Sequence, residues 1–555
     1  MDASYVSGCS DHPLLYRTIG AAFDHVVALH GDREATVVLH QDVRLSYTDL
    51  AARVDAFASG LLALGLEPGD RVGIWSPNNI EWVVTQLATA KAGLILVNIN
   101  PAYRVGELEY CLKKVGCRAL VLAQRLKTSD YCAMVAELAP EVTTAPPGAL
   151  RIARLPELEW LIAIGDAPPR GFMAFDEVAT RATADTAAVL ATLACRLQPE
   201  EPINIQFTSG TTGSPKGATL THHNILNNAF FSARRMGLSP EDRLCIPVPL
   251  YHCFGMVLGV LAAITHGACM VFPSESFDPA AVLQAVTAER CTGLHGTPTM
   301  FIAELDHPAF SGFELSSLRT GIMAGAPCPV AVMKRVIEQM NMRDVTIGYG
   351  MTEVSPLSFQ TAPGDSLERR VETVGRVHDF VEAKIIGPDG RVLPRGIQGE
   401  ILFRGYSLMH GYWDDAERTA ETIDQDGWIH SGDLATMDSD GYVRITGRAK
   451  DMIIRGGENI YPREIEEFLH RHPDVQEAQV FGVPSELYGE EVCAWIRARS
   501  ADLTEQAVRD YCRGRIAHYK APRHIRFVTE FPMTVTGKVQ KFAMRERMTA
   551  ELAAQ

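Results

Sequence analysis

The chain has 555 residues and a net charge of −15, from 52 basic and 67 acidic side chains. This acidic balance excludes a general nucleic-acid-binding protein, whose binding domain is usually basic. The hydrophobic content of 46% and the charged content of 21% are those of a globular protein. At about 100 to 200 residues per domain, the length predicts about three or four structural units.

The cysteines and the first residues bear on the compartment. The 12 cysteines include no C-x-x-C pair, so we expect reduced, mostly buried thiols and no zinc site. The N-terminal stretch has no basic segment followed by an apolar one, and it is too acidic for a typical transit peptide. The longest apolar run, residues 256–264, is far shorter than the roughly 20 residues that span a bilayer. We therefore expect a cytoplasmic protein without a transmembrane segment.

Up to about residue 447, short apolar runs alternate with amphipathic stretches, which is typical of α/β proteins. Parallel strands with covering helices are therefore the predicted architecture of this first segment. Strands are expected over residues 71–75, 119–123 and 269–272, and helices over residues 81–92 and 280–290.

The most informative stretch is residues 207–217, FTSGTTGSPKG. Its glycines let backbone N–H groups approach an anion closely, its hydroxyl side chains donate further hydrogen bonds, and Lys216 supplies a cation. These are the groups that bind a triphosphate. A flexible surface hairpin is the alternative that a Gly/Ser/Thr composition allows, but the lysine within the whole string favours phosphate binding.

This loop is not a P-loop of the G-x-x-x-x-G-K-[ST] type. Lys216 follows Pro215, and Gly217 stands where that motif has a hydroxyl residue. Residues 203–207 before the loop alternate like a strand, and residues 218–220 after it are expected to be extended. We therefore expect a loop that joins strand to strand, without a helix dipole behind it.

After Arg448 the pattern becomes compact and indicates a small α+β domain. Pro462 is expected to open a helix whose apolar residues share one face. The elements expected after that helix are strands over residues 478–483 and 492–498, a helix over residues 505–516 and a strand over residues 524–531.

The loop resembles the third core motif of the superfamily of acyl-CoA synthetases, adenylation domains and luciferases. The fifth to eighth and the tenth motifs have counterparts in the same order, so coincidence is excluded. These counterparts are GYGMTE at 348–353, GEILFRGYSLMHGY at 399–412, SGD at 431–433, GRAKDMIIRGGE at 447–458 and GK at 537–538.

The C-terminal stretch IAHYKAPRHIRFVTEFPMTVTGKVQKF most resembles the medium-chain acyl-CoA synthetase branch known as family member two. The resemblance covers the chain except for about the first dozen residues. One departure is the pair His378-Asp379, where relatives usually place an apolar residue and a proline. We expect this pair to change a local turn without removing a motif residue.

The resemblance implies an α/β fold in two domains. Residues 1–449 would form a large N-terminal domain of α/β subdomains plus a β-rich subdomain, and residues 450–555 a small, mobile α+β domain. ATP, Mg²⁺ and coenzyme A are the implied cofactor and co-substrates. The residues that the resemblance assigns to binding them are Thr208, Ser209, Gly210, Thr211, Thr212, Gly213, Ser214, Pro215, Lys216, Gly325, Ala326, Pro327, Tyr349, Asp433, Arg448, Gly456 and Gly457.

Three of the implied catalytic residues act on the phosphates. Glu353 would hold the magnesium ion that bridges the ATP phosphates, since Mg²⁺ prefers oxygen ligands. Thr352 would contact the α-phosphate. Lys538 would reach the bound carboxylate and the α-phosphate, where a positioned cation stabilises the charge that develops during adenylation. Outside their motifs, Glu353 and Lys538 would be read as solvated charges.

The nucleoside of ATP has its own implied contacts. Tyr349 would lie against adenine, with AGAP at residues 324–327 as the opposite wall. Asp433 would accept hydrogen bonds from both ribose hydroxyls, which an ionised carboxylate does well, and Arg448 would be the second ribose contact. Without its motif, Tyr349 would be read as a core tyrosine and Asp433 as a turn residue.

Lys450 occupies the hinge position of the eighth motif, about which the small domain would swing between the two half-reactions. One pose would bring Lys538 to the site, and the other would bring Gly456 and Gly457 beside the pantetheine tunnel. The basic cluster of Arg513, Arg515, Lys520 and Arg523 could meet the phosphates of coenzyme A or be a solvated face, and both interpretations stay open.

His252 lies in PLYHCFG, which resembles the fourth motif, where a ring closes over the acyl pocket. It is the fourth implied catalytic residue, and a core or capping histidine is the alternative. Gly296 and Gly325 would leave room at the floor of the pocket, although glycines also serve turns.

The function that the resemblance implies is an ATP-dependent acyl-CoA ligase that forms an acyl-adenylate and then a thioester. Medium-chain fatty acids are the expected substrates, and aryl, branched or sulfur-containing acids are alternatives. An oxygenase of the luciferase kind shares the fold and is a further alternative. A nucleotide-binding relic is also possible in principle, but such a relic would have lost Lys538, Asp433 or Glu353. The partners are therefore small molecules, and the oligomeric state stays open, a homodimer included.

Overall fold

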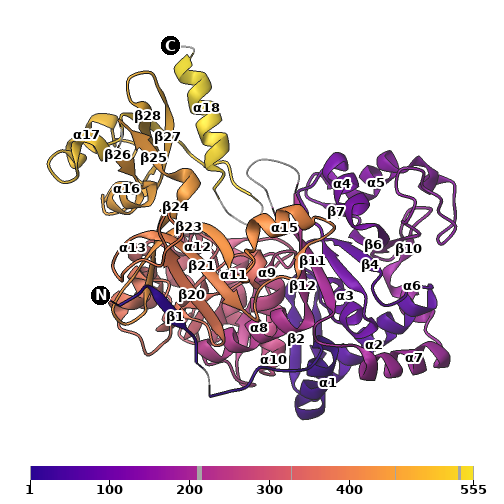
Figure 1. Ribbon diagram of the computed structural model, residues 1–555. Helices are drawn as coiled ribbons and strands as arrows, with labels where there is room; N and C mark the ends of the chain where they lie inside the picture. The colour runs from indigo at the N-terminus through magenta and orange to yellow at the C-terminus, as the bar shows by residue number, and fades with distance from the viewer. Residues whose placement is uncertain are drawn as a thin grey trace.

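The computed structural model describes residues 2–9, 11–208, 215–326, 328–456, 458–534 and 539–553. Figure 1 shows a large mixed α/β N-terminal part and a smaller C-terminal part that projects from it. The predicted fold class is thereby confirmed. Among the predicted site residues, Ser209, Gly210, Thr211, Thr212, Gly213, Ser214, Pro327, Gly457 and Lys538 lie outside the described residues.

The first large sheet carries the strands on either side of the phosphate loop. Its neighbouring strands pair in parallel, except that the last two pairings at one edge are antiparallel. Its described strands follow the order β10 (Met173–Ala174), β9 (Trp160–Ile164), β6 (Cys117–Ala123), β4 (Arg71–Trp75), β5 (Ile95–Asn98), β11 (Pro202–Thr208), β12 (Lys216–Thr221) and β22 (Gly411–Tyr412).

The second large sheet is parallel in its middle and antiparallel at both edges. Its described strands follow the order β19 (Arg376–Val377), β18 (Phe359–Gln360), β17 (Asp344–Tyr349), β16 (Thr320–Met323), β15 (Gly293–Leu294), β13 (Arg243–Cys245), β14 (Cys269–Phe272), β2 (Glu34–Val38) and β3 (Val43–Ser46).

The central strands of both sheets are buried on two faces, which explains their nearly continuous apolar runs. In β6, Val121 packs into the core between the sheets, whereas Leu120 and Leu122 pack into the core on the outer face. This alternation follows from the two-residue period of a strand. The helices that fill the space between the sheets are α1 (Ile19–His30), α2 (Tyr47–Ala63), α3 (Ile80–Ala92), α8 (His222–Met236) and α10 (Ala262–Thr265).

Further helices cover the outer faces. On the first sheet they are α4 (Val105–Val115) and α5 (Tyr131–Leu138). On the second sheet they are α11 (Pro279–Glu289), α12 (Pro298–Leu305) and α13 (Val330–Gln339). The result is a stack of alternating helical and sheet layers, as expected when parallel strands need cover on both faces.

A third sheet is antiparallel and packs against the same core as the outer helices of the second sheet. At its edge, the N-terminal strand pairs with a strand that lies more than 370 residues later in the chain, and Tyr5 lies opposite Lys384. Its described strands are β1 (Tyr5–Ser7), β20 (Val381–Ile386), β21 (Gly399–Gly405), β23 (Ile429–Met437) and β24 (Val443–Arg448).

The C-terminal part has its own sheet and its own core. β29 (His524–Phe527) joins the sheet by parallel pairing with β28. The other described strands are β26 (Glu458–Ile460), β25 (Ile453–Arg455), β28 (Gly489–Ala498) and β27 (Val475–Ser485), and the helices are α16 (Pro462–Leu469), α17 (Glu505–Cys512) and α18 (Lys541–Ala553). The predicted boundary at residues 449/450 falls between β24 of the third sheet and β25 of this one.

Two predicted elements of this part are shorter than expected. The helix expected over residues 505–516 ends at Cys512, because Arg513 leaves the helical conformation and Gly514 adopts a φ of 71°. The strand expected over residues 524–531 ends at Phe527, where its parallel pairing with β28 ends at Ile496.

The departure at His378-Asp379 falls in the turn that leads into β20. His378 is fully buried, its Nε2 lies 3.1 Å from Gln360 Oε1, and the turn continues through Phe380 at a φ of 58°. Burial holds the pKa of His378 well below the ordinary value. A neutral histidine is therefore accommodated in the core at this turn.

Candidate active site

The strands that flank the phosphate loop are placed as the sequence predicts. β11 and β12 pair antiparallel, with Thr208 opposite Lys216, and Thr208 Oγ1 lies 3.5 Å from the Lys216 carbonyl oxygen. The hydroxyl of Tyr110 on α4 donates to the Pro215 carbonyl at 3.1 Å. The described residues on either side of the loop therefore lie in neighbouring antiparallel strands of one sheet, as the strand-to-strand prediction expects.

Tyr412 connects the loop lysine to the predicted magnesium ligand. The Lys216 Nζ lies 4.8 Å from the centroid of the Tyr412 ring. The hydroxyl of the same ring donates to Oε1 of Glu353 at 2.8 Å. Burial, and then the charge of Glu353, raise the pKa of Tyr412, so the phenol stays a hydrogen-bond donor. A cation, a ring and a carboxylate from three distant segments thus converge.

Glu353 is held in place through both its side chain and its backbone. Only 7% of Glu353 is exposed. It lies in the short 3-10 turn η5 (Thr352–Val354), and its carbonyl accepts from the Met409 N–H at 2.9 Å. Thr352 is half-buried at the start of this turn. One carboxylate oxygen is occupied by Tyr412, and an acidic group with a second oxygen fits a Mg²⁺ ion that is also held by phosphates.

Asp433, Tyr349 and Arg448, which are the residues predicted to contact the ribose and the adenine, lie together. Asp433 and Arg448 face each other across β23 and β24, with Arg448 Nε 3.2 Å from Asp433 Oδ1. The Tyr349 hydroxyl, at the end of β17, donates to Asp433 Oδ2 at 2.6 Å. The sequence assigned these three residues to one nucleoside, and the structure brings all three together.

The titration of Asp433 follows from this geometry. Burial raises the pKa of the Asp433 carboxyl, and Arg448 and then the Tyr349 hydroxyl oppose that rise. The Asp433 side chain is 14% exposed, whereas that of Arg448 is 63% exposed. The carboxylate is therefore a nearly enclosed acceptor, and the arginine remains open to a ligand from solvent.

The segments of Gly296 and Gly325 meet at the ends of neighbouring parallel strands. Gly296 bridges to Met323, and Ala324 N–H donates to the Gly296 carbonyl at 3.3 Å. Gly325 adopts a φ of 86°, a conformation that favours glycine, and it is exposed. Ala326 beside it is half-buried. The carboxyl ends of parallel strands are where α/β folds place ligands.

His252 caps a helix, as the alternative interpretation expects. Its Nδ1 accepts from the Phe254 N–H at 3.1 Å, at the start of α9 (Cys253–Gly255). The helix continues through the π-helical segment η3 (Met256–Leu261), and such segments are frequent at functional sites. The capping contact does not exclude a role of the half-buried ring at the acyl pocket, which stays a prediction.

Two polar residues that sequence reasoning missed hold the His252 segment on the first sheet. Gln206 Oε1 accepts from the Cys253 N–H at 3.1 Å, and Asn98 donates to the Tyr251 carbonyl at 2.9 Å. Both are buried polar side chains near the ends of β11 and β5. A signal for Asn98 was available, because it directly follows the apolar run 95–97, whereas Gln206 lies in a strand that alternates polar and apolar residues.

In the small part, Lys450 is exposed in η6 (Ala449–Asp451), between the two sheets. Gly456 adopts a φ of 59°, and a Cβ there would lie 3.3 Å from Tyr488 Cδ1. In the basic cluster, Lys520 lies 2.7 Å from Glu464 and Arg513 lies 3.0 Å from Asp510. Two of these cations already have carboxylate partners, which favours the solvated face.

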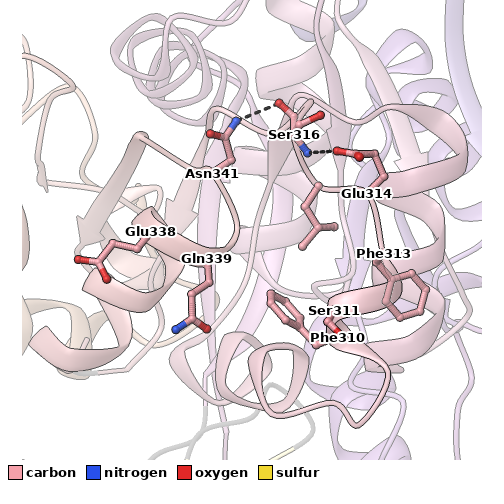
Figure 2. Close-up of a pocket in the computed structure, with 9 residues that line it drawn as sticks. Phe310, Ser311, Phe313, Glu314, Ser316, Glu338, Gln339 and Asn341 are labelled. Atoms are coloured by element: carbon pink, nitrogen blue, oxygen red, sulfur yellow. Dashed lines mark hydrogen bonds between the residues drawn. The ribbon is translucent and has the colours of Figure 1, made fainter.

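A cavity of about 340 Å³ lies elsewhere, between η4 (Phe310–Gly312) and the end of α13, as Figure 2 shows. Phe310 and Phe313 line it, together with Glu314 and Glu338. None of the predicted site residues contributes to its wall.

Among the described residues, each helix is too short or too polar to cross a membrane.

Comparison with known sequences gives matches along the whole chain. A profile of the AMP-binding enzyme family matches residues 23–413, and one of the AMP-binding enzyme C-terminal domain matches residues 464–538. The mitochondrial medium-chain acyl-CoA ligase of Danio rerio is 47% identical over 556 residues, covering 100% of this chain and 92% of that protein. The protein YngI of Bacillus subtilis is 48% identical, covering 96% of this chain and 97% of its own.

Solved structures match over nearly the full length too. An anthranilate CoA ligase in complex with anthranoyl-AMP has a TM-score of 0.86 at 27% identity, covering 98% of this chain and 99% of its own. ATP-bound MatB from Rhodopseudomonas palustris has a TM-score of 0.82 at 29% identity, covering 96% and 99%. The apo form of MatB has a TM-score of 0.72 at 28% identity, covering 97% and 99%.

Proposed function

The chain belongs to the AMP-binding enzyme family, and we propose that it is an ATP-dependent acyl-CoA ligase whose acids are medium-chain fatty acids. The observation that carries the substrate class is the 47% identity to a medium-chain acyl-CoA ligase over the whole chain. Anthranilate, an aryl acid, is the substrate of a structural neighbour at 27% identity, so an aryl acid is the second candidate.

In the first half-reaction, a carboxylate oxygen of the acid attacks the α-phosphorus of ATP, and pyrophosphate leaves. Lys216 and the N–H groups of the phosphate loop bind the phosphates, and Lys538 stabilises the charge that develops at phosphorus. Glu353, oriented by Tyr412, would hold the Mg²⁺ ion. When bound, that ion neutralises phosphate charge and orients the leaving group.

In the second half-reaction, the thiolate of coenzyme A attacks the acyl carbon of the adenylate, and AMP leaves. The close arrangement of Asp433, Tyr349 and Arg448 supports their assignment to the nucleoside of the adenylate. We infer that the small domain rotates about Lys450 between the two steps, bringing Gly456 and Gly457 in place of Lys538. Glycines suit this wall, because the thiol must pass close to the backbone.

The domain arrangement of this structure supports assignment to the first half-reaction. One protein, MatB, gives a TM-score of 0.82 in its ATP-bound form and 0.72 in its apo form. The identity and coverage of the two comparisons are nearly the same, so we infer that the difference in TM-score comes from how the parts are arranged. We therefore infer that the described arrangement is the adenylating pose.

The direct test is pyrophosphate release with ATP, Mg²⁺ and a panel of acids from acetate to long-chain fatty acids, plus benzoate and anthranilate. Each acid is assayed with and without coenzyme A. A maximum among the medium-chain acids, with turnover that requires coenzyme A, is expected. A maximum among the aryl acids would favour the second candidate, and release that coenzyme A does not accelerate would reject coenzyme A as the acceptor.

The compartment and the assembly state remain predictions. The name of the relative from Danio rerio places that protein in mitochondria, and YngI is a bacterial relative of similar identity. We propose a cytoplasmic location, and the mitochondrial relative names the alternative compartment. Fractionation of the native host tests the location, and light scattering of the purified protein tests the homodimer.

A further inference from the structure

The carboxylate of Asp306, at the end of α12, is shared between the two parts of the chain. Its Oδ1 lies 2.9 Å from Arg335 Nη2 on α13, within the large part. Its Oδ2 accepts from Gln476 Nε2 on β27 at 3.1 Å and lies 3.6 Å from Arg499 Nη1 just after β28. In Figure 1 the small part lies on the side of the large part where α13 is labelled. We call this set of Asp306, Gln476 and Arg499 the Asp306 contact.

A structural interpretation explains only half of these bonds. Asp306 follows the last residue of α12, and its pairing with Arg335 ties α12 to α13 whatever the small part does. That role needs one oxygen. The other oxygen contacts a neutral donor and a cation, both from the small part. The Asp306 side chain is only 22% exposed, so these partners replace much of its contact with water. A charge placed this way at a domain junction favours the arrangement in which both donors reach it.

Another tie between the two parts, also among the described residues, lies closer to the hinge. Arg463 on α16 donates through Nη1 to the Ile445 carbonyl on β24 at 2.7 Å. Ile445 is only five positions before Lys450, so this bond lies near the predicted axis of rotation. The Asp306 contact joins α12 to strands that begin well after the hinge. A large rotation about Lys450 would therefore separate the Asp306 contact.

We propose that Asp306 is a positioning residue that stabilises the adenylating pose against the thioester-forming pose, through Gln476 and Arg499. The proposal rests on the proposed function, because it assigns this arrangement to the first half-reaction. If the poses exchange rapidly, the rate of each half-reaction is proportional to the population of its pose. The ratio of the adenylation rate to the thioester rate then follows the pose equilibrium, wherever that equilibrium lies.

The test measures both rates in single turnovers of the full chain. Adenylation is followed as pyrophosphate release without coenzyme A, and thioester formation by adding coenzyme A to the preformed acyl-adenylate. Asp306→Ala removes the carboxylate, and Gln476→Ala with Arg499→Ala removes its donors without touching α12. An ion pair near the surface shifts an equilibrium by about two- to fivefold. In both contact variants, the ratio of the adenylation rate to the thioester rate is therefore expected to fall by about that factor. Glu372→Gln, which breaks an exposed ion pair with Arg444 inside the large part, is the matched control.

Coupling separates the proposal from a local packing effect. With all three residues replaced, the ratio is expected to fall no further than with Asp306→Ala alone, because both changes remove one contact. An unchanged ratio in the Gln476→Ala/Arg499→Ala variant would overturn the proposal, even if Asp306→Ala fails to fold. An equal fall of both rates would overturn it as well.

Failure of the proposed function looks different. In that case the wild-type enzyme releases pyrophosphate but forms no thioester, so the rate ratio has no value. The contact is then tested by the rate of trypsin cleavage at the exposed linker around Lys450. Faster cleavage in both contact variants than in Glu372→Gln is the expected result, and equal cleavage overturns the proposal.

Discussion

The hydroxyl of Tyr412 donates to the Glu353 carboxylate at 2.8 Å, across 59 positions of sequence. The same ring lies under the ammonium group of Lys216. The predicted phosphate-binding cation and the predicted magnesium ligand are therefore both in contact with a single side chain. Any change of this ring is expected to act on the binding of metal and phosphate together.

Tyr412→Phe keeps the ring beside Lys216 and removes the hydrogen bond that orients Glu353. A net hydrogen bond contributes about 1 kcal/mol, so the Mg²⁺ concentration for half-maximal activity should rise about fivefold. A Mg²⁺ titration of pyrophosphate release measures this shift. Tyr442→Phe is the matched control, because Tyr442 also bonds a carboxylate and lies under arginine side chains. An equal Mg²⁺ requirement in wild type and Tyr412→Phe would show that the bond does not orient a metal ligand.

At acidic pH the affinity for ATP should fall as the pH decreases, and Tyr349→Phe should move this fall (the acidic limb of the profile) to higher pH. The ionised Asp433 is the proposed acceptor of the ribose hydroxyls, so ATP affinity should be lost as the pH falls through the pKa of Asp433. Burial already raises that pKa, and the Tyr349 hydroxyl opposes the rise. Removing the hydroxyl therefore raises the pKa further.

ATP affinity measured by calorimetry across the acidic range checks this shift. Tyr5→Phe removes a hydrogen bond of the same length, 2.6 Å, between a tyrosine and a glutamate at the sheet edge, and should leave the profile unchanged. A limb of Tyr349→Phe that coincides with wild type would contradict the assignment of Asp433 as the titrating acceptor.

His252→Asn and His252→Ala separate the two roles of this residue. Asparagine is a good N-cap, whereas alanine loses the bond to the Phe254 N–H at a cost of about 1 kcal/mol. Only His252→Ala should lower the thermal midpoint clearly. Both variants should change the preference among acids, because both remove the ring. Acid profiles identical to wild type in both variants would leave His252 as a cap alone.

Lys538→Ala should reduce adenylation by at least about 100-fold, the scale of removing one key electrostatic donor. Acid-dependent pyrophosphate release measures the loss. Lys541→Ala is a useful control, since that lysine is occupied by Glu466 at 2.6 Å. Near-normal release by Lys538→Ala would reject the assignment of Lys538 to the first step.

Lys450→Pro should retain adenylation and lose thioester formation, because proline fixes φ at the predicted hinge. The two half-reactions are measured separately, as for Asp306. A loss of similar size in both would argue against a hinge at this position.

Much of the fold and of the nucleotide site could be predicted, because local patterns carry the information. The strands expected over residues 71–75 and 269–272 match β4 and β14 residue for residue. The antiparallel strands around the phosphate loop follow from the alternation of their residues. The gathering of Asp433, Tyr349 and Arg448 follows from their motifs.

The contacts that could not be predicted join segments distant in the sequence. Tyr412 ends a recognised motif, but its contact with Glu353 depends on how β22 lies against η5. A local pattern of apolar residues carries no information on that packing. Asp306 carries no motif at all, and its neighbours lie about 170 and 190 positions later. The position of the last turn of α17 depended on a left-handed glycine, Gly514, rather than on the apolar pattern.

The most direct measurement is the product balance with a medium-chain fatty acid, ATP, Mg²⁺ and coenzyme A. Chromatography of one reaction quantifies AMP, pyrophosphate and acyl-CoA together. An acyl-CoA ligase of the AMP-binding enzyme family should form the three in equal amounts, each dependent on the acid. Formation of ADP and phosphate, or of AMP without acyl-CoA, would contradict the proposed function.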